Sequence, residues 1–373
     1  MIGEKIFGDA RAVGALIEQV RAALQDAAPD LERITLMEVC GTHTHAIGAA
    51  GLRGLLPPAI RLVSGPGCPV CVTPVSYLDR AEALSALPDT LICTFGDLFR
   101  VPSSHVSLER LAAEGRRIRI VYSPRDALDL ARRHPEWRVI FLSIGFETTT
   151  PTIAAALAEA EADDVGNFLI LPGNKTIPPA LRALAEDPDV RLDGFLLPGH
   201  VSVITGWHCY RFLAEEHRLA AAVAGFAPTD VMQGILNLTR QRVEGRAEVV
   251  NLYGRVVTPG GNRVAQEVAE RFFEPDDADW RGLGALPGSG LKLRDAWAHR
   301  DASRIEVELP PPAEPAGCRC GDVLKGLIDP PDCPLFGRTC DPDRPLGACM
   351  VSSEGSCAAW YRHERGRFKE WHE

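Results

Sequence analysis

Short apolar segments with the character of strands alternate with segments of helical periodicity along most of this chain. Strands are predicted at residues 34–39, 60–63, 90–94, 118–122, 138–144, 168–171, 194–197 and 221–226. Helices are predicted at residues 9–27, 46–56, 151–163, 178–186 and 229–245. Strands that alternate with helices form βαβ units, in which right-handed crossovers join parallel strands. The sequence therefore predicts an α/β fold with parallel sheets.

The length of 373 residues predicts two or three domains. We expect an α/β domain at residues 1–123, a second α/β domain at 124–245 and a C-terminal domain at 246–373. The C-terminal domain contains a proline-rich linker at 310–315, and its tail from Cys318 onward has few apolar runs. Because such a tail buries little core, a metal cluster is a plausible means of stabilising it.

The charge and hydropathy of the chain exclude several classes of protein. The formal net charge is -10 and no basic cluster occurs, which argues against a nucleic-acid partner. No apolar stretch approaches the roughly 20 residues that cross a bilayer. The first residues carry charges where a signal peptide is apolar. We therefore expect a cytoplasmic protein without a membrane partner.

The chain has 11 cysteines, and disulfide stapling is disfavoured for a protein of this size in a reducing compartment. Five of them lie within the first 209 residues, and six lie between Cys318 and Cys357. This uneven distribution indicates two kinds of cysteine chemistry.

Cys40 lies directly after the predicted strand 34–39, in the segment Cys-Gly-Thr-His-Thr-His. Backbone N–H groups at the following helix start favour a thiolate, which is a natural ligand for a soft, low-valent metal. His43 is close enough in sequence to act as a base, a ligand or a hydrogen-bond donor. A buried structural cysteine beside a capping threonine is the alternative, and the local residues do not decide between the two.

Cys68 and Cys71 form a C-x-x-C pair after a Gly-Pro-Gly turn. The spacing brings the two sulfurs within reach of a disulfide, and the first thiol of such a pair often has a lowered pKa. Half of a zinc site is the main competitor, but the chain contains no second C-x-x-C. A redox-active dithiol is the favoured interpretation.

Glu147 lies in the segment Gly-Phe-Glu-Thr-Thr-Thr-Pro, which joins a predicted strand to a predicted helix. Threonines before a proline make a good helix start, and this structural interpretation is favoured from the residues alone. The functional interpretation makes Glu147 an acid, a base or an orienting carboxylate beside a cleft. Turns at 64–69, 171–175 and 197–200 also follow strands, where ligands bind in open α/β sheets. Unless they are plain turns, they should line one or two facing clefts.

Six cysteines crowd the C-terminal tail: Cys318, Cys320, Cys333, Cys340, Cys349 and Cys357. Four thiolates hold either zinc or an iron–sulfur cluster. The spacing matches neither a zinc ribbon nor the common ferredoxins, so spacing alone leaves the metal undecided.

Together these motifs resemble the hydrogenase maturation protein D family, HypD. The matching segments are Met-Glu-Val-Cys-Gly-Thr-His-Thr at 37–44, Gly-Pro-Gly-Cys-Pro-Val-Cys-Val-Thr at 65–73, Gly-Phe-Glu-Thr-Thr-Thr at 145–150, Leu-Pro-Gly-His-Val-Ser at 197–202 and Cys-Met-Val-Ser-Ser-Glu-Gly at 349–355. They occur in order over nearly the whole chain, and five together are highly specific.

The resemblance implies two Rossmann-like domains around a cleft and a third domain with a [4Fe–4S] cluster. It implies a scaffold on which the Fe(CN)₂CO unit of [NiFe]-hydrogenase is built. Cys40 would be the iron ligand, Cys68 and Cys71 the redox-active dithiol, and His43 and Glu147 would support the cleft. The implied partners are a small chaperone, protein C, the cyanide donor, protein E, and indirectly the hydrogenase large subunit.

For the cluster ligands we expect Cys318, Cys333, Cys340 and Cys349, with Cys320 as a rival to Cys318 and Cys357 as the spare. Electrons would pass from the cluster to the dithiol and on to iron. The main alternative is a thiol–disulfide oxidoreductase of the ferredoxin–thioredoxin reductase kind, which would not need the Cys40 motif. A zinc-stabilised nucleotide-binding protein is the third hypothesis.

Overall fold

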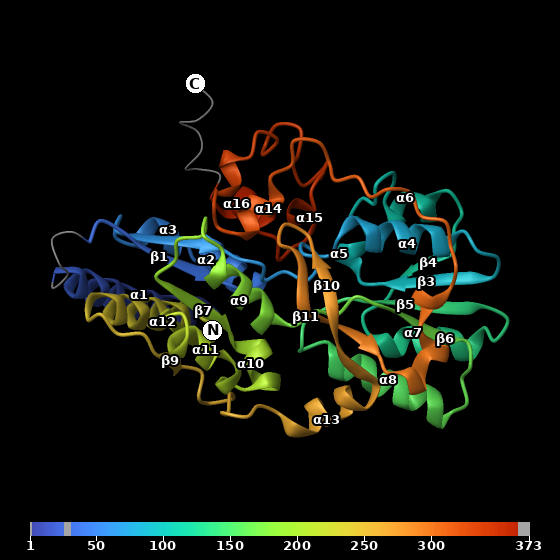
Figure 1. Cartoon of the computed structure of the whole chain (residues 1–373). Helices are drawn as coiled ribbons and strands as arrows, with labels where there is room; N and C mark the ends of the chain where they lie inside the picture. Colours follow the sequence, from blue (N-terminus) through green and yellow to red (C-terminus); the bar gives the residue numbers. More distant parts are fainter. Residues whose placement is uncertain (1, 26–30, 365–373) are drawn as a thin grey trace.

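Two parallel β-sheets form two lobes that lie side by side in this computed structural model, which describes residues 2–25 and 31–364 (Figure 1). The sheet of the first lobe has the strand order β2-β1-β7-β8-β9. The sheet of the second lobe has the order β4-β3-β5-β6. The predicted α/β class with parallel sheets is confirmed.

The first sheet contains β1 (Ile34–Glu38), β2 (Ile60–Ser64), β7 (Gly194–Pro198), β8 (Ala220–Ala224) and β9 (Val249–Asn251). Its lobe carries α1 (Ile2–Gln25), α2 (Gly41–Ala49), α3 (Leu52–Leu55), α9 (Ile177–Glu186), α10 (Gly199–Thr205), η1 (His208–Tyr210), α11 (Arg211–Glu215) and α12 (Pro228–Val243). The second sheet contains β3 (Thr90–Thr94), β4 (Ile118–Ile120), β5 (Arg138–Ser143) and β6 (Phe168–Pro172). Its lobe carries α4 (Val75–Ser85), α5 (Gly96–Phe99), α6 (Leu108–Ala113), α7 (Pro124–Arg133) and α8 (Thr150–Ala162).

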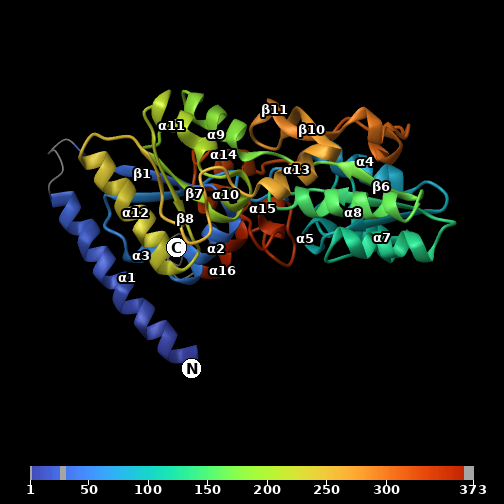
Figure 2. The ribbon, with the colours of Figure 1, turned by 90° about the horizontal axis from the view of Figure 1, so that it is seen from below.

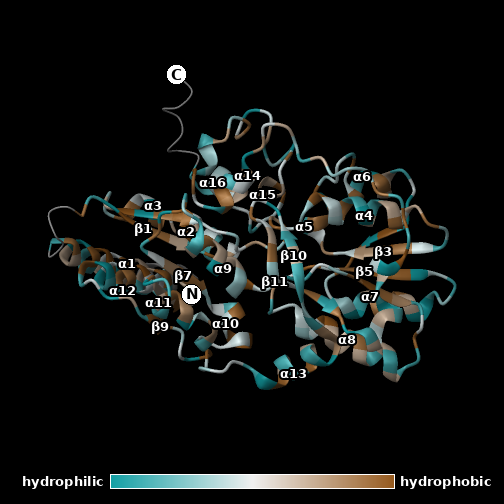
Figure 3. Cartoon of the chain, viewed as in Figure 1, coloured by the Kyte–Doolittle hydropathy of each residue, from teal (hydrophilic) through white to brown (hydrophobic). Residues whose placement is uncertain are grey.

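The central strands are mostly apolar and buried because helices cover both faces of each sheet. Every residue of β3 and of β8 is buried, as expected for parallel strands, and Figure 3 shows hydrophobic segments in the strands of both sheets. The apolar stripe of α1, formed by Val13, Ile17 and Val20, packs beside α12 in the core of the first lobe (Figure 2). The helix predicted at 9–27 is confirmed as far as Gln25, and residues 26 and 27 lie outside the described residues.

The division of the chain between the two sheets does not follow the predicted domain boundary at residues 123 and 124. After β2 the chain enters the second lobe and completes its sheet with β6, and it then returns to the first sheet with β7, which pairs with β1. The predicted strands at 138–144 and 194–197 therefore lie in different sheets. Alternation along the sequence predicts strands, but it does not show that strands more than 150 residues apart are paired.

A long antiparallel hairpin, absent from the predicted strands, lies between the lobes (Figure 1). It consists of β10 (Phe273–Trp280) and β11 (Gly284–Leu293), and it follows α13 (Arg263–Phe272), which packs on α8. Its strands contain aspartates, prolines and glycines, which are poor strand formers, so the apolar pattern of a strand is absent. At its turn, the Arg281 N–H donates to the carbonyl of Val72 at 2.9 Å.

Residues 318–364, the cysteine-rich segment, lie across the junction of the two lobes (Figure 1). The chain reaches it through η2 (Asp295–Arg300) and η3 (Ala302–Arg304), and the segment contains α14 (Cys320–Leu324), η4 (Pro330–Asp332), α15 (Ala348–Val351) and α16 (Ser356–His363). Helix α16 packs on α2 of the first lobe, and Arg100 of the second lobe donates to the carbonyl of Val351 at 3.1 Å. In the described part of the chain, no helix is both long enough and apolar enough to cross a bilayer.

Candidate functional site

A cavity of about 200 Å³, here called the cleft, opens where strands of both lobes end. Its lining comprises Val39, Cys40, Thr42, Gly67, Pro69, Phe146, Thr148, Thr149, Pro198, His200, Val201 and Glu354. These residues end or follow β1, β2, β5 and β7, apart from Glu354 of the cysteine-rich segment. The predicted turns at 64–69 and 197–200 therefore meet in one cleft, whereas the turn at 171–175 lines a separate cavity of about 400 Å³.

Cys40 ends the loop after β1 and precedes α2, where its side chain is buried but lines the cleft. Burial raises the pKa of this thiol to about 12, and the nearby carboxylates of Glu354 and Glu38 act in the same direction. The backbone N–H groups of His43 and Thr42 lower the pKa, as the helix start predicts, but they do not outweigh burial. The predicted preference for the thiolate is therefore reversed, because the sequence does not reveal how deeply the sulfur is buried.

His43 is fully buried and is held by the end of β8. Its Nε2 donates to the Gly225 carbonyl at 2.9 Å, and its ring packs against Phe226 with 4.8 Å between centroids. Burial lowers the pKa of His43 to about 4, so the ring is neutral at physiological pH. Of the three roles considered for His43, the structure shows that of a hydrogen-bond donor. His200 lines the cleft and packs on the same phenyl ring at 3.9 Å.

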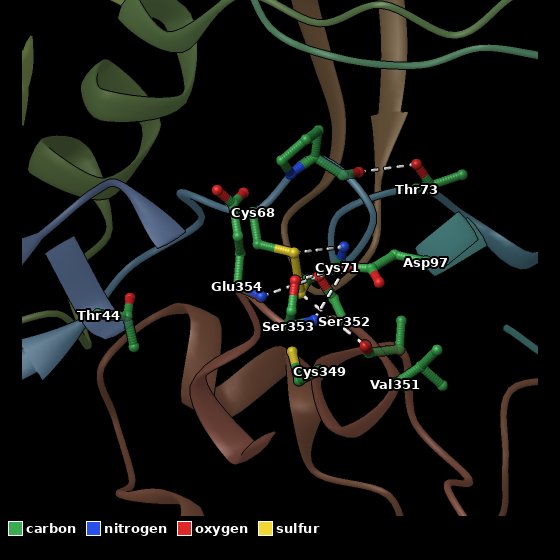
Figure 4. The surroundings of a disulfide bond; sticks show 12 residues. Thr44, Cys68, Cys71, Thr73, Asp97, Cys349, Val351, Ser352, Ser353 and Glu354 are labelled. Atoms are coloured by element: carbon green, nitrogen blue, oxygen red, sulfur yellow. Dashed lines mark hydrogen bonds between the residues drawn. A yellow bond between two sulfur atoms is a disulfide. The ribbon is translucent and has the colours of Figure 1, made fainter. Parts of the chain in front are cut away.

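Cys68 and Cys71 form a disulfide, with 5.2 Å between their Cα atoms (Figure 4). Both residues are buried, and the Cys71 N–H donates to Cys68 Sγ at 3.1 Å. The loop that carries them is bonded to the Cys40 loop, because the Gly41 N–H donates to the Gly67 carbonyl at 3.0 Å. Gly67 packs so closely there that a Cβ atom on it would lie 2.1 Å from the Cys40 nitrogen.

Glu147 is buried and points to the start of α9, where its Oε1 accepts a hydrogen bond from the Ile177 N–H at 2.9 Å. Burial raises the pKa of Glu147 to about 7 against the effect of backbone N–H groups. Thr148 and Thr149 line the cleft, as expected for this motif, but the Glu147 carboxylate is not part of the described lining. Glu147 therefore ties the loop that carries Thr148 and Thr149 to the start of α9.

All six cysteines of the cysteine-rich segment line one small cavity. The four predicted ligands, Cys318, Cys333, Cys340 and Cys349, are therefore brought together, and so are Cys320 and Cys357. The sulfurs of Cys320 and Cys349 lie 2.6 Å apart. This hydrogen bond lowers the pKa of Cys320 and raises the pKa of Cys349. The positive charge of Arg281 also lowers the pKa of Cys320.

The donors in this cavity suit an iron–sulfur cluster. Thiolates are the usual ligands of such clusters, and the other lining residues are Leu335, Phe336, Gly347 and Met350. Across residues 2–25 and 31–364, no three or more His, Cys, Asp or Glu side chains are arranged to hold one metal ion. A cluster of several irons spreads its four thiolates more widely than a single ion does.

The cysteine cavity, the disulfide and the cleft are adjacent. Cys71 Sγ lies 4.0 Å from the carbonyl oxygen of Ala348, whose peptide bond continues to Cys349, and Figure 4 shows Cys349 next to the disulfide. Five residues further along, Glu354 reaches the cleft and accepts a hydrogen bond from Thr42 Oγ1 at 3.1 Å. Three groups that are distant in the sequence thus lie next to one another.

Two carboxylates beside Cys40 received no role in the sequence analysis. Glu38 accepts hydrogen bonds from the Cys40 N–H at 3.3 Å and from Thr44 Oγ1 at 2.6 Å. Glu354 belongs to the matching segment 349–355, so its motif was noted, but only the fold shows that it lines the cleft. The sequence signal that could have identified Glu38 was its position two residues before Cys40.

Known proteins match nearly the whole chain. Residues 14–364 match the family described as "HypD: Hydrogenase formation hypA family". The chain is 44% identical over 372 residues to the hydrogenase maturation factor HypD of Rhodobacter capsulatus, with 97% of each chain covered. It is 45% identical to the HypD of Azotobacter vinelandii, covering 95% of this chain and 96% of that one, and 44% identical to that of Escherichia coli K12, covering 94% and 95%. The chain therefore belongs to the HypD family of hydrogenase maturation factors.

Proposed function

We propose that this protein is a scaffold on which the Fe(CN)₂CO unit of [NiFe]-hydrogenase is assembled, with Cys40 as the anchor of the iron. The observation that carries the proposal is that the cleft, the disulfide and the cysteine cavity are adjacent. Iron with cyanide and carbonyl ligands is low-valent and soft, and a thiolate suits such a metal. The Cys40 thiol lines a cleft between the two lobes, where it can bind a small iron complex.

The walls of the cleft suit the ligands of that cargo. Cyanide nitrogen accepts hydrogen bonds, and the hydroxyls of Thr148 and Thr149 and the imidazole of His200 can donate them. Because burial keeps the Cys40 thiol protonated, iron must displace this proton when it binds. Glu38 and Glu354 are the carboxylates whose charges act on this thiol. We propose that they limit how much negative charge the cleft can hold once iron is bound.

We propose that four of the six C-terminal cysteines hold a [4Fe–4S] cluster, and that Cys318, Cys333, Cys340 and Cys349 are the ligands. When bound, the cluster would supply single electrons beside the disulfide. Reduction of the Cys68–Cys71 bond takes up two electrons and two protons and gives two thiols, and reoxidation releases them next to the Cys40 loop. These two steps make the Cys68–Cys71 pair an electron relay between the cysteine cavity and the cleft.

The alternative function of a thiol–disulfide oxidoreductase suits the structure less well. Cys68 and Cys71 are only 4% and 0% exposed, so neither sulfur is presented to the disulfide of another protein. If turnover of a disulfide substrate persisted in Cys40→Ala, that alternative would be favoured.

We propose that the protein acts in the cytoplasm with two proteins of the same maturation system. These are the small chaperone, protein C, and the cyanide donor, protein E, and the hydrogenase large subunit is the eventual recipient of the iron unit. The hydrogenase maturation role of the curated relatives supports a place in this system.

Hydrogenase maturation in cells provides the test of this function. The chain is produced in place of the resident HypD, together with the other maturation proteins, and [NiFe]-hydrogenase activity is measured. We expect Cys40→Ala to abolish activity and Cys209→Ala to keep it, because the Cys209 thiol donates to the Gly206 carbonyl and is not part of the described cleft lining. Full activity of Cys40→Ala would contradict the proposal.

A further inference from the structure

Arg281 is a buried arginine at the turn of the β10–β11 hairpin, and only 7% of the residue is exposed. Its backbone N–H donates to the Val72 carbonyl, next to Cys71. The neighbouring Gly282 packs on the backbone of Gly321, next to Cys320, so closely that a Cβ on Gly282 would lie 2.5 Å from the Gly321 Cα. The hairpin thus fixes Arg281 between the disulfide loop and the cysteine cavity.

The positive charge of Arg281 is only partly compensated. Its Nε lies 3.1 Å from Glu314 Oε1, a carboxylate on the linker whose side chain is 55% exposed. Its Nη2 is buried and has no hydrogen-bond partner in the described part of the chain. A guanidinium stays charged, and a buried charge requires opposite charge nearby. Arg281 directly precedes Gly282, which packs on Gly321, and Gly321 follows Cys320 of the cavity that all six cysteines line.

We propose that Arg281 sets the reduction potential of the iron–sulfur cluster assigned to the cysteine cavity. This inference rests on the proposed function. A thiolate-bound cluster is anionic, and its reduction adds one electron from an external low-potential one-electron donor, without breaking a bond. A fixed buried cation stabilises the more negative, reduced form, so it raises the potential.

Redox titration of the reconstituted protein tests this role. The full chain is loaded anaerobically with iron and sulfide and titrated with dithionite in the presence of mediators, and cluster reduction is followed by electron paramagnetic resonance. In Arg281→Met we expect the ratio of reduced to oxidised cluster at a given solution potential to fall at least tenfold. For a one-electron couple this is a shift of about 59 mV to more negative potential.

Two variants serve as controls for charge and position. Arg281→Lys keeps the charge and should stay close to the wild-type potential. Arg319→Met removes an arginine that lies between Cys318 and Cys320 in the sequence, but whose side chain is 48% exposed and paired with Asp322 at 2.7 Å. Because water and that carboxylate screen it, Arg319→Met should leave the potential unchanged.

Glu314→Gln provides the opposite test and remains available if Arg281→Met does not fold. It removes the counter-charge of Arg281 at a half-exposed linker position, so the potential should shift to a more positive value. An unchanged potential in cluster-loaded Arg281→Met, or in Glu314→Gln if Arg281→Met does not fold, overturns this inference alone. A wild-type protein that binds no iron overturns the proposed cluster together with it.

Discussion

Burial determines the protonation state of the ionisable side chains around the cleft. It raises the pKa of Glu38 and of Glu147 to about 7, and it lowers the pKa of His43 to about 4. The same effect raises the pKa of Cys40 to about 12. Charged forms are therefore disfavoured wherever no partner compensates them. The sequence indicated which residues could titrate, but their burial comes from packing between elements that are distant in the chain.

Glu147 should make the stability of the protein depend on pH. Its pKa is about 7 in the folded protein against an ordinary value of 4.5, so between these values the folded state binds more protons than the unfolded state. The free energy of unfolding therefore falls as the pH rises, by about 3 kcal/mol over that interval. Glu147→Gln removes this contribution and keeps an acceptor for the Ile177 N–H.

The measurement is urea unfolding at several pH values for the wild type, Glu147→Gln and the exposed control Glu267→Gln. The wild type and Glu267→Gln should lose stability relative to Glu147→Gln between pH 4.5 and 7. If the curves of all three proteins run parallel, burial does not shift Glu147 as described.

Gly67 should not tolerate a side chain, because a Cβ atom there would overlap the backbone of Cys40. We expect Gly67→Ala to lower the free energy of unfolding by about 1–3 kcal/mol or more, which is typical of overpacking. Gly14→Ala is the matched control, because it lies within α1 with no atom within 4 Å of its Cβ position, and alanine favours a helix. Equal unfolding midpoints for the two variants in urea would contradict the close packing of the two loops.

At the scale of elements, the strands were predictable and their partners were not. The β3 bounds match the prediction, and β1, β2 and β7 differ from it by one residue at their ends, because apolar runs bounded by turns mark buried strands. The turns after β2, β6 and β7 were predicted to line one or two clefts, since ligands bind at the carboxyl ends of parallel strands, and those after β2 and β7 line the cleft. The β10–β11 hairpin was not predictable, because its sequence is polar and rich in glycine. The position of Glu354 in the cleft was not predictable either, because it depends on how the cysteine-rich segment packs on the two lobes.

The cluster ligands are a prediction at the scale of this segment. We expect Cys333→Ala to lose most cluster iron after anaerobic reconstitution. The other thiols of the cavity lie on other turns of the chain, so none of them takes the position of the missing ligand. Cys357→Ala should keep the iron of the wild type, because we assign Cys357 as the spare. Iron and sulfide analysis per chain distinguishes these outcomes. Full iron in Cys333→Ala would exclude Cys333 as a ligand.

At the scale of the whole molecule, the site depends on contacts between three parts of the chain. The largest apolar cluster contains Met37 of the first lobe, Ile140 of the second and Met350 of the cysteine-rich segment, so one core joins all three. Asp97 of α5 accepts hydrogen bonds from Ser352 and Ser353, which fixes the approach of Glu354 to the cleft. The five motifs identified the components, but only the fold brings them next to one another.

An infrared spectrum of the anaerobically purified protein, bound to its small chaperone partner, tests the central role of Cys40 most directly. The wild type should show the stretching bands of iron-bound cyanide and carbonyl, and Cys209→Ala should show them too. In Cys40→Ala these bands should vanish although the cluster iron remains. Unchanged bands in Cys40→Ala would contradict the role of Cys40 as the anchor. If a cluster-loaded, partner-bound wild type shows no such bands, the scaffold function itself is contradicted, and the Cys68–Cys71 pair becomes the primary site.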